Sequence, residues 1–230
     1  MEKFHLAYLG HSGFALELAD CVLIFDYYID PAGKLSQFFK AEKPVYVFAS
    51  HAHSDHFSPA VFQWEKRTAA YILHSGCRFS DMPENVRLME PGEERAFPEF
   101  TVHMYGSTDE GGSFMIRHPQ GRIFHAGDLN WWHWAGESDE ENRRAGRQFM
   151  AELEKIGETE ADIAFFPVDA RLEVAREWGV KRFLECIKIR TLLIPMHACG
   201  ARWCPSYEFR WRYRDTPLWI PVCEGEEWIK

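Results

Sequence analysis

Long hydrophobic runs are missing from this sequence, and basic residues are scarce. No stretch approaches the ~18 apolar residues that a membrane-spanning helix needs, so we expect no membrane partner. The 26 Lys and Arg residues are outnumbered by 35 Asp and Glu residues, which gives a net charge of -9. Because nucleic-acid binding depends on clustered positive charge, this balance argues against nucleic acid as a partner. The one basic cluster is interpreted as solvated surface: Arg202, Arg210, Arg212 and Arg214.

A disulfide framework, a secretion signal and low-complexity linkers are also missing. The six cysteines are scattered and are interpreted as free thiols, with Cys199 and Cys204 as an alternative source of a metal-binding thiolate. The N-terminal segment "MEKFHLAYLGHSGF" indicates a first strand rather than a signal peptide, so we expect a cytoplasmic protein. With no internal repeat, the chain is predicted to form a single domain over residues 1–230, while nothing in it indicates an oligomeric state.

The hydrophobic pattern predicts strands and helices in alternating batches. Apolar runs of strand length cover residues 4–10, 14–19, 21–26, 44–50, 71–74, 100–106, 112–118, 122–127, 161–169 and 190–197. A helix is predicted at 59–67, after the N-cap Ser58. A second begins at the capping box formed by Ser138 and Glu141 and ends at Gly157. Two more are predicted at 180–188 and 205–214. Two batches of strands, each followed by helices, predict an α/β (α+β) fold with two packed sheets and helices outside.

One short segment gathers an unusual number of polar groups. In "FASHAHSDHFSP", His51, His53, Asp55 and His56 follow a buried strand directly. Positions two apart in an extended loop point the same way, so His51 and His53 are placed to bind one ion, while the following turn brings Asp55 and His56 toward a second position. Packing four such groups together costs desolvation unless a cation compensates. Imidazole and carboxylate suit Zn²⁺, Mn²⁺, Fe²⁺ or Ni²⁺, with Zn²⁺ preferred.

The segment "HAHSDH" resembles the H-x-H-x-D-H signature of the metallo-β-lactamase superfamily. Asp26 in "VLIFD", Asp128 in "HAGD" and His197 in "IPMH" resemble that family's later polar strand ends. Within the family, "YLGHSGFALEL", "IFHAGDLN" and "LLIPMH" are similar to the branch that contains ascorbate-6-phosphate lactonase and related metal-dependent hydrolases. The resemblance covers essentially the whole chain and implies a four-layer αββα sandwich.

The resemblance also implies one or two metal ions. One ion would be bound by His51 and His53 and the other by Asp55, His56 and His197, with Asp128 between them. The chain departs from the family where a third-motif histidine is expected, because Ser107 stands there in "YGSTDEGGS". Three explanations stay open: a replacement ligand from Asp109 or Glu110, a replacement from His133, or a first position that binds its ion weakly or only with substrate.

The activity that the resemblance implies is hydrolysis of a small molecule by metal-activated water. Asp55 would bind metal and orient the attacking water, Asp128 would hold the two ions close, and Asp26 would stabilise the ligand loops from behind. Ester, lactone and phosphodiester substrates all suit this chemistry. Asp169, at the end of a buried strand, is a further candidate. Residues expected around the substrate are His11, Asn130, Trp131, Trp132, His133 and Trp134.

Three other functions are weighed against hydrolysis. A nuclease would share H-x-H-x-D-H, but this chain is compact and acidic and lacks an inserted basic arm. Relatives that carry out redox chemistry at two irons replace the second histidine with glutamate, and His53 argues against that reading. A metal-binding or sensor protein that has lost catalysis along with the third-motif histidine remains the non-enzymatic alternative.

Overall fold

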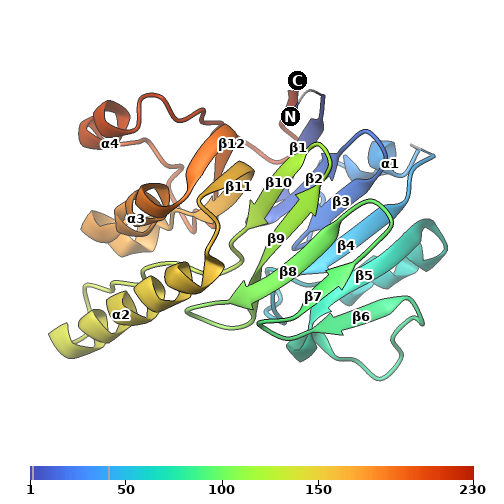
Figure 1. The fold of residues 1–230 in the computed structure, drawn as a ribbon, viewed down its shortest axis with the longest axis horizontal. Helices are drawn as coiled ribbons and strands as arrows, with labels where there is room; N and C mark the ends of the chain where they lie inside the picture. The colour runs from blue at the N-terminus through green and yellow to red at the C-terminus, as the bar shows by residue number, and fades with distance from the viewer. Residues whose placement is uncertain (2, 41) are drawn as a thin grey trace.

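Two β-sheets pack face to face in the computed structural model, which describes residue 1 and residues 3–40 and 42–230 (Figure 1). Among these residues, the first sheet has the strand order β13-β1-β2-β3-β4-β5-β6. Its strands are β1 (His5–Gly10), β2 (Gly13–Glu17), β3 (Val22–Phe25), β4 (Val45–Ala49), β5 (Thr68–His74), β6 (Val86–Met89) and β13 (Glu227–Ile229). Strands β1 to β3 are antiparallel, whereas β3 to β6 are parallel.

The second sheet has the order β12-β11-β10-β9-β8-β7 over the described part of the chain. Its strands are β7 (Glu94–Ala96), β8 (Thr101–Gly106), β9 (Gly112–His118), β10 (Gly121–His125), β11 (Glu160–Pro167) and β12 (Lys188–Met196). Strands β7 to β10 are antiparallel and β10 to β12 are parallel. Each sheet therefore has an antiparallel half and a parallel half.

Aromatic side chains fill the space between the sheets. Phe14 and Phe25 of the first sheet lie with ring centroids 4.6 and 5.6 Å from that of Phe165 in the second. Phe48 contacts Phe114 across the same interface with centroids 5.3 Å apart. All five are fully buried, as the near-continuous apolar strands of the sequence predict for sheets covered on both faces. This packing fixes how the strand ends of the two sheets face each other.

Helices cover the outer faces. The outer face of the first sheet packs against α1 (Leu35–Phe38) and the 3₁₀ helix η1 (Pro59–Arg67), and that of the second packs against α2 (Asp139–Ile156) and α3 (Trp178–Cys186) (Figure 1). The remaining helical segments are η2 (Ser75–Cys77), η3 (Ala170–Ala175) and α4 (Tyr207–Arg212). The αββα sandwich is thus confirmed. No helix among the described residues combines the length and apolar character that crossing a bilayer requires.

The helix boundaries follow local sequence signals. Ser138 and Glu141 form the predicted capping box at the start of α2, and Gly157 ends the helix in the left-handed conformation with φ 63°. Ser58 accepts a hydrogen bond from the amide of Ala60, as its role of N-cap predicts. The helix that Ser58 begins is a 3₁₀ helix, however.

Candidate metal centre

Loops after strand ends bring the candidate ligands together between the sheets. Asp26 follows β3, and the segment from His51 to His56 follows β4. These two strands of the first sheet are parallel, so both loops leave the same edge of the sheet. Asp128, Asp169 and His197 follow β10, β11 and β12 of the second sheet. Carboxyl ends of parallel strands share one edge of a sheet, so five separate stretches of sequence converge here.

Asp128 lies at the centre of three imidazoles. Its Oδ1 atom is 3.3 Å from Nε2 of His56 and 3.4 Å from Nε2 of His197. Its Oδ2 atom is 3.5 Å from Nε2 of His51. All four side chains are buried. One carboxylate thus faces both halves of the predicted ligand set, which is the position that a bridging ligand needs.

Carboxylates behind His56 and His197 fix the orientation of these rings. His56 Nδ1 donates to Oδ2 of Asp26 at 2.8 Å, and His197 Nδ1 donates to Oδ2 of Asp169 at 3.1 Å. With Nδ1 held by a carboxylate, Nε2 is the atom of each ring that is placed to bind a cation. The structure therefore places Asp26 where the sequence predicted a supporting carboxylate, and gives Asp169 the equivalent place behind His197.

Ser50 gives the same support to His51. Its hydroxyl donates to Oδ2 of Asp26 at 2.7 Å, so its oxygen accepts from Nδ1 of His51 at 2.9 Å. The backbone amide of Ser50 also donates to Asp26 Oδ1 at 2.8 Å. Asp26 thus orients two ligand histidines at once, one directly and one through Ser50. Ser50 was not predicted as a site residue, because nothing in the sequence distinguishes a serine at the end of a strand before the loop is folded.

Two groups of possible donor atoms in the described structure contain the predicted ligands. His51, His53 and Asp128 offer atoms within 4.8 Å of one another, and so do His11, Asp55, His56 and His197. The first three belong to the predicted first position, and the last three are the predicted ligands of the second. His11 is the new member of this set. The positions of these donor atoms therefore support two neighbouring cation positions.

His11 enters the second group through the turn between β1 and β2. Its backbone has a φ of 52°, a left-handed conformation that is uncommon outside glycine, and its carbonyl accepts a hydrogen bond from the amide of His197 at 3.2 Å. The ring lies 4.1 Å from the ring of His197, centroid to centroid, and its Nε2 is 3.4 Å from Oδ2 of Asp55. Burial, and then the neighbouring His197 and His56, lower the pKa of His11 to about 4. The neutral imidazole therefore has a lone pair to offer a cation.

Unpaired polar atoms test whether these residues suit a cation. Nε2 of His11, Nε2 of His56 and Oδ1 of Asp128 are buried without a hydrogen-bond partner among the described residues. An unpaired buried polar atom costs ~1–3 kcal/mol. Nε2 of His56 lies 3.3 Å from Oδ1 of Asp128, and His56 shares a donor group with His11. A divalent cation satisfies all three together, whereas water satisfies only some of them because it has two protons to donate. The residues fit the metal that the fold implies.

Charge at the centre is set by the carboxylates. Burial alone would raise the pKa of Asp128, but the adjacent His197 and His56 outweigh it and hold the pKa well below its ordinary value. Burial also opposes ionisation of Asp26, yet His125 and His56 bring its pKa down to about 2. Both carboxylates are therefore ionised at neutral pH and ready to balance bound cations.

The loop that lacks the third-motif histidine offers acidic groups instead. Asp109 lines the same cavity as His53 and Asp128, and burial, with Asp128 next, raises its pKa. Glu110 places Oε2 3.5 Å from Nε2 of His53 on the exposed side. His133 packs against Trp178 with centroids 4.6 Å apart and rings tilted by 53°, and it does not line this cavity. Among the predicted replacements, Asp109 has the position that best suits a ligand.

A cavity of about 330 Å³ opens over the ligands, at the small end of typical ligand sites. Trp132 and Trp134 form one wall, with rings stacked at 5.7 Å and an interplanar angle of 4°. Asn130 is buried away from the cavity, where its side-chain oxygen accepts from the amide of Trp131 at 2.9 Å. Of the predicted aromatic contacts, Trp132 and Trp134 thus reach the cavity, and Trp131 packs behind them against Phe149.

Two glycines allow the ligand loops to approach. A Cβ atom on Gly111 would lie 2.0 Å from the carbonyl oxygen of Ser50 and 2.5 Å from Cβ of His51. Gly127, next to Asp128, would place a Cβ atom 2.7 Å from Cβ of Ser50. Both have positive φ, 75° and 53°, which glycine adopts without strain. The glycines of "GG" and "AGD" are visible in the sequence, but only the fold shows which atoms a side chain at Gly111 or Gly127 would meet.

Another group of possible donors does not share these properties. Asp20, Cys21 and His118 lie close together at the far ends of their strands. The amide of Gln120 donates to Nδ1 of His118 at 3.0 Å, so Nε2 carries the proton and donates to Asp20 at 2.7 Å. No lone pair is left on that ring for a cation. The group is a hydrogen-bonded contact between two turns.

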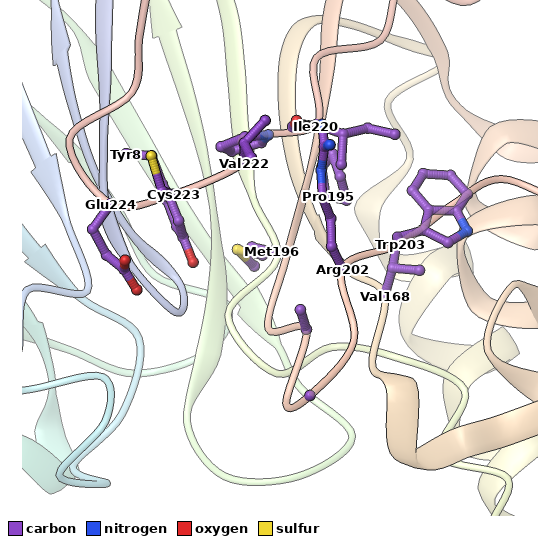
Figure 2. A pocket seen from close by; sticks show the side chains of 13 residues that line it. Tyr8, Val168, Pro195, Met196, Arg202, Trp203, Ile220, Val222, Cys223 and Glu224 are labelled. Atoms are coloured by element: carbon purple, nitrogen blue, oxygen red, sulfur yellow. Dashed lines mark hydrogen bonds between the residues drawn. The ribbon is translucent and has the colours of Figure 1, made fainter.

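A second cavity, of about 220 Å³, lies near the C-terminal segment (Figure 2). Tyr8, Cys223 and Glu224 stand on one side of it and Arg202 and Trp203 on the other (Figure 2). None of the metal-centre donors lines this cavity. The chemistry that the ligands can support is therefore confined to the cavity over Asp128.

Comparisons with known proteins agree with this geometry. A family model described as a beta-lactamase superfamily domain matches residues 5–140, which include the histidine segment and Asp128. A protein of Opitutus terrae named a UPF0173 metal-dependent hydrolase is 30% identical over 207 residues, covering 84% of this chain and 83% of that protein. A similar protein of Methylacidiphilum infernorum is 29% identical over 210 residues, covering 81% and 82%.

Solved structures show the same fold. A metallo hydrolase from Ignicoccus hospitalis superposes with a TM-score of 0.65 at 19% identity, covering 99% of this chain and 98% of the other. The narrower resemblance to ascorbate-6-phosphate lactonase stays a prediction. From the family match, the identity to metal-dependent hydrolases and the ligand set around Asp128, we conclude that the chain belongs to the metallo-β-lactamase superfamily and is a metal-dependent hydrolase.

Proposed function

We propose that the protein hydrolyses a small ester, lactone or phosphodiester with two divalent cations, Zn²⁺ by preference, bound around Asp128. The observation that carries this proposal is the convergence of unpaired buried atoms from His11, His56 and Asp128 beside the cavity. His51, His53 and Asp128, with Asp109, would hold one cation. His11, Asp55, His56 and His197 would hold the other. Mn²⁺, Fe²⁺ and Ni²⁺ suit the same mixed donors.

A cation bound here would supply a water whose pKa falls from 15.7 toward ~7, together with a positive charge that polarises the bond under attack. Asp55 keeps a half-exposed carboxylate at the edge of the cavity, where it would accept a hydrogen bond from the attacking water and set its direction. Asp26 and Asp169 keep the histidine rings fixed, so the geometry exists before substrate arrives. Trp132 and Trp134 shield one side of the cavity from solvent.

The substrate is proposed to be a small molecule because the cavity is small and its walls are acidic and aromatic. Neither feature suits nucleic acid, whose binding depends on basic groups. The six cysteines are free thiols, which supports the proposed cytoplasmic location.

Turnover with a defined metal tests the proposal. The metal-free protein is loaded with Zn²⁺ or Mn²⁺ and assayed on a panel of esters, lactones, phosphodiesters and single-stranded RNA. We expect metal-dependent turnover of one small-molecule class, lost on chelation and lowered at least about 100-fold in Asp55→Asn, the usual scale for losing a group that directs proton transfer. Tight metal binding without turnover of any substrate would favour the sensor alternative, and cleavage of RNA alone would favour the nuclease.

A further inference from the structure

Arg171 is the one lysine or arginine that lines the cavity over the metal centre in the described structure. It lies in the first turn of η3, two residues after Asp169. The residue is half exposed, with 53% of the side-chain surface accessible, although it takes part in an ion pair with a fully buried carboxylate. Neutralising Asp169 does not by itself require the guanidinium of Arg171 to face the cavity.

The guanidinium is held on one of its two edges. Nε of Arg171 donates to Oδ1 and Oδ2 of Asp169 at 3.1 and 3.0 Å, and Nη2 donates to Oδ2 at 2.6 Å. These bonds use the Nε–Nη2 edge. Nη1 has no hydrogen-bond partner among the described residues, so the Nη1–Nη2 edge keeps free protons in the planar arrangement that matches a carboxylate or a phosphate.

The aromatic wall holds the same group in place. The guanidinium carbon of Arg171 lies 5.4 Å from the ring centroid of Trp134, in cation–π range. Trp134 stacks on Trp132, and Trp132 donates from Nε1 to the backbone carbonyl of Asp128 at 2.9 Å. An arginine fixed in this way loses little conformational entropy on binding a ligand. The position is therefore rigid as well as exposed.

Charge balance at the loaded centre points to the same kind of ligand. The carboxylates that face the cavity are Asp55, Asp109 and Asp128, and divalent cations bound beside them neutralise their charge. Asp169 is already satisfied by Arg171, by the backbone amide of Arg171 at 2.8 Å and by His197. The free edge of Arg171 then meets no competing carboxylate in the cavity.

We infer that Arg171 binds an anionic group of the substrate, a carboxylate or a phosphate, and so selects acidic substrates for the adjacent metal centre. This inference rests on the proposed hydrolase function. It narrows the substrate class from any small ester or lactone to one that carries a negative charge at a fixed distance from the bond that is cleaved. Lysine would not replace Arg171 fully, because one ammonium group cannot bind Asp169 and an oxyanion along two planar edges.

A pair of esters that differ by one charge tests the inference. The Zn²⁺-loaded wild-type protein, Arg171→Met, Arg171→Lys and the control Arg147→Met, at an exposed site on α2, are assayed with 4-nitrophenyl hydrogen succinate and with its neutral methyl ester. We expect kcat/KM for the charged ester to fall at least about tenfold in Arg171→Met, the scale of one charge-assisted hydrogen bond. The neutral ester should change by less than about threefold, and Arg171→Lys should lie between.

An equal loss with both esters would overturn the inference, because Arg171 would then act only by supporting Asp169 and His197. Metal content, measured on every variant, should equal that of the wild type. A deficit confined to Arg171→Met would also assign the residue to ligand support.

A binding measurement separates failure of the inference from failure of the proposed function. Inorganic phosphate and succinate are titrated calorimetrically into the same Zn²⁺-loaded proteins, with no reaction required. At least about tenfold weaker binding of either anion to Arg171→Met supports the anion site even if no ester is hydrolysed, and the anion that loses more affinity identifies the preferred group. Equal affinities in wild type and variant would mean that the cations alone bind the anion, and the inference would be wrong.

Discussion

Nε2 of His11, in the turn after the first strand, lies 3.4 Å from Oδ2 of Asp55, in the loop after the fourth. Both atoms belong to the second donor group, and Nε2 of His11 has no hydrogen-bond partner among the described residues. His11 is thus placed as a ligand rather than as a wall of the substrate cavity, which it does not line.

The first prediction concerns this ligand. His11→Asn should weaken binding of one of two cations by at least about tenfold, because it removes a donor while asparagine tolerates the left-handed backbone that His11 adopts. Stepwise metal titration by calorimetry measures the effect. His133→Asn is the matched control, since that ring packs against Trp178 outside the cavity, and it should retain both cations. Loss of a cation in His133→Asn, with none in His11→Asn, would reverse the assignment.

Asp109 is predicted to take the place of the missing third-motif histidine. Asp109→Asn should weaken the first cation position by at least about tenfold and leave the second unchanged, because an amide is a poorer ligand than a carboxylate. Glu110→Gln, one residue away and on the exposed side of His53, is the control and should have a smaller effect. Metal content after dialysis reports both. Two tightly held cations in Asp109→Asn would show that Asp109 is not the replacement ligand and would also exclude a weak first position.

Asp26 should contribute to both stability and metal affinity. In Asp26→Asn, the amide cannot accept from His56, the Ser50 amide and the Ser50 hydroxyl together, so at least one buried donor loses its partner. We expect a loss of about 1–3 kcal/mol in the free energy of unfolding and about 10- to 100-fold in metal affinity. Denaturant unfolding and calorimetry measure the two effects, with the exposed Asp81→Asn as control. Unchanged affinity would show that the ring of His56 is oriented by packing alone.

Gly111 is predicted to be intolerant of a single added methyl group. A Cβ atom there meets the backbone carbonyl of Ser50 at 2.0 Å, and the residue has a φ of 75°. Gly111→Ala should therefore cost at least about 1–3 kcal/mol in stability and displace the loop that carries His51, lowering metal affinity. Gly136→Ala, with nothing within 4 Å of the new atom, is the control. Equal melting temperatures for the two variants would contradict the close approach of the loops.

Glu177 provides a prediction about pH. It accepts from the backbone amide of Ser206 at 2.7 Å and from Nε1 of Trp203 at 3.0 Å, which fastens the C-terminal segment to α3. Burial opposes ionisation, but the hydrogen bonds from Ser206 outweigh it and lower the pKa of Glu177. A depressed folded-state pKa contributes stability above the ordinary pKa of ~4.3 and loses it as the pH falls through the folded value.

Glu177→Gln should therefore lower the free energy of unfolding by about 1–3 kcal/mol at pH 7, with the difference from wild type shrinking as the pH falls below ~4. Urea unfolding across that range measures it. The exposed Glu154→Gln should show no such difference at any pH. A gap between wild type and Glu177→Gln that stays constant with pH would mean that packing, not charge, fastens the segment.

How far the sequence predicts the site depends on where each residue lies relative to its strand. Asp26, Asp128 and His197 were predicted because the strand ends that carry them resemble the motifs of the family, and the structure brings all three to one centre. His11 was expected beside the site, as a substrate contact or replacement ligand, but was not assigned to either metal position. Only the packing of the β1–β2 turn against the end of β12, seen in the hydrogen bond from the His197 amide, brings it to the ligands.

Short edge strands were the least predictable part of the fold. The strands β6 (Val86–Met89), β7 (Glu94–Ala96) and β13 (Glu227–Ile229) lie at the edges of the two sheets or next to them and were not predicted. Each has three or four residues and is partly exposed, so no hydrophobic periodicity marks it. Their pairing is decided by neighbours that are distant in the sequence, such as β1 for β13.

The ligands come from both sheets, with His51 and His56 on one and Asp128 and His197 on the other. A cation that they share is consequently a crosslink between the two halves of the sandwich, and its binding energy adds to the energy of folding. Scarcity of the ion should then shorten the lifetime of the protein in the presence of proteases as well as slow its chemistry.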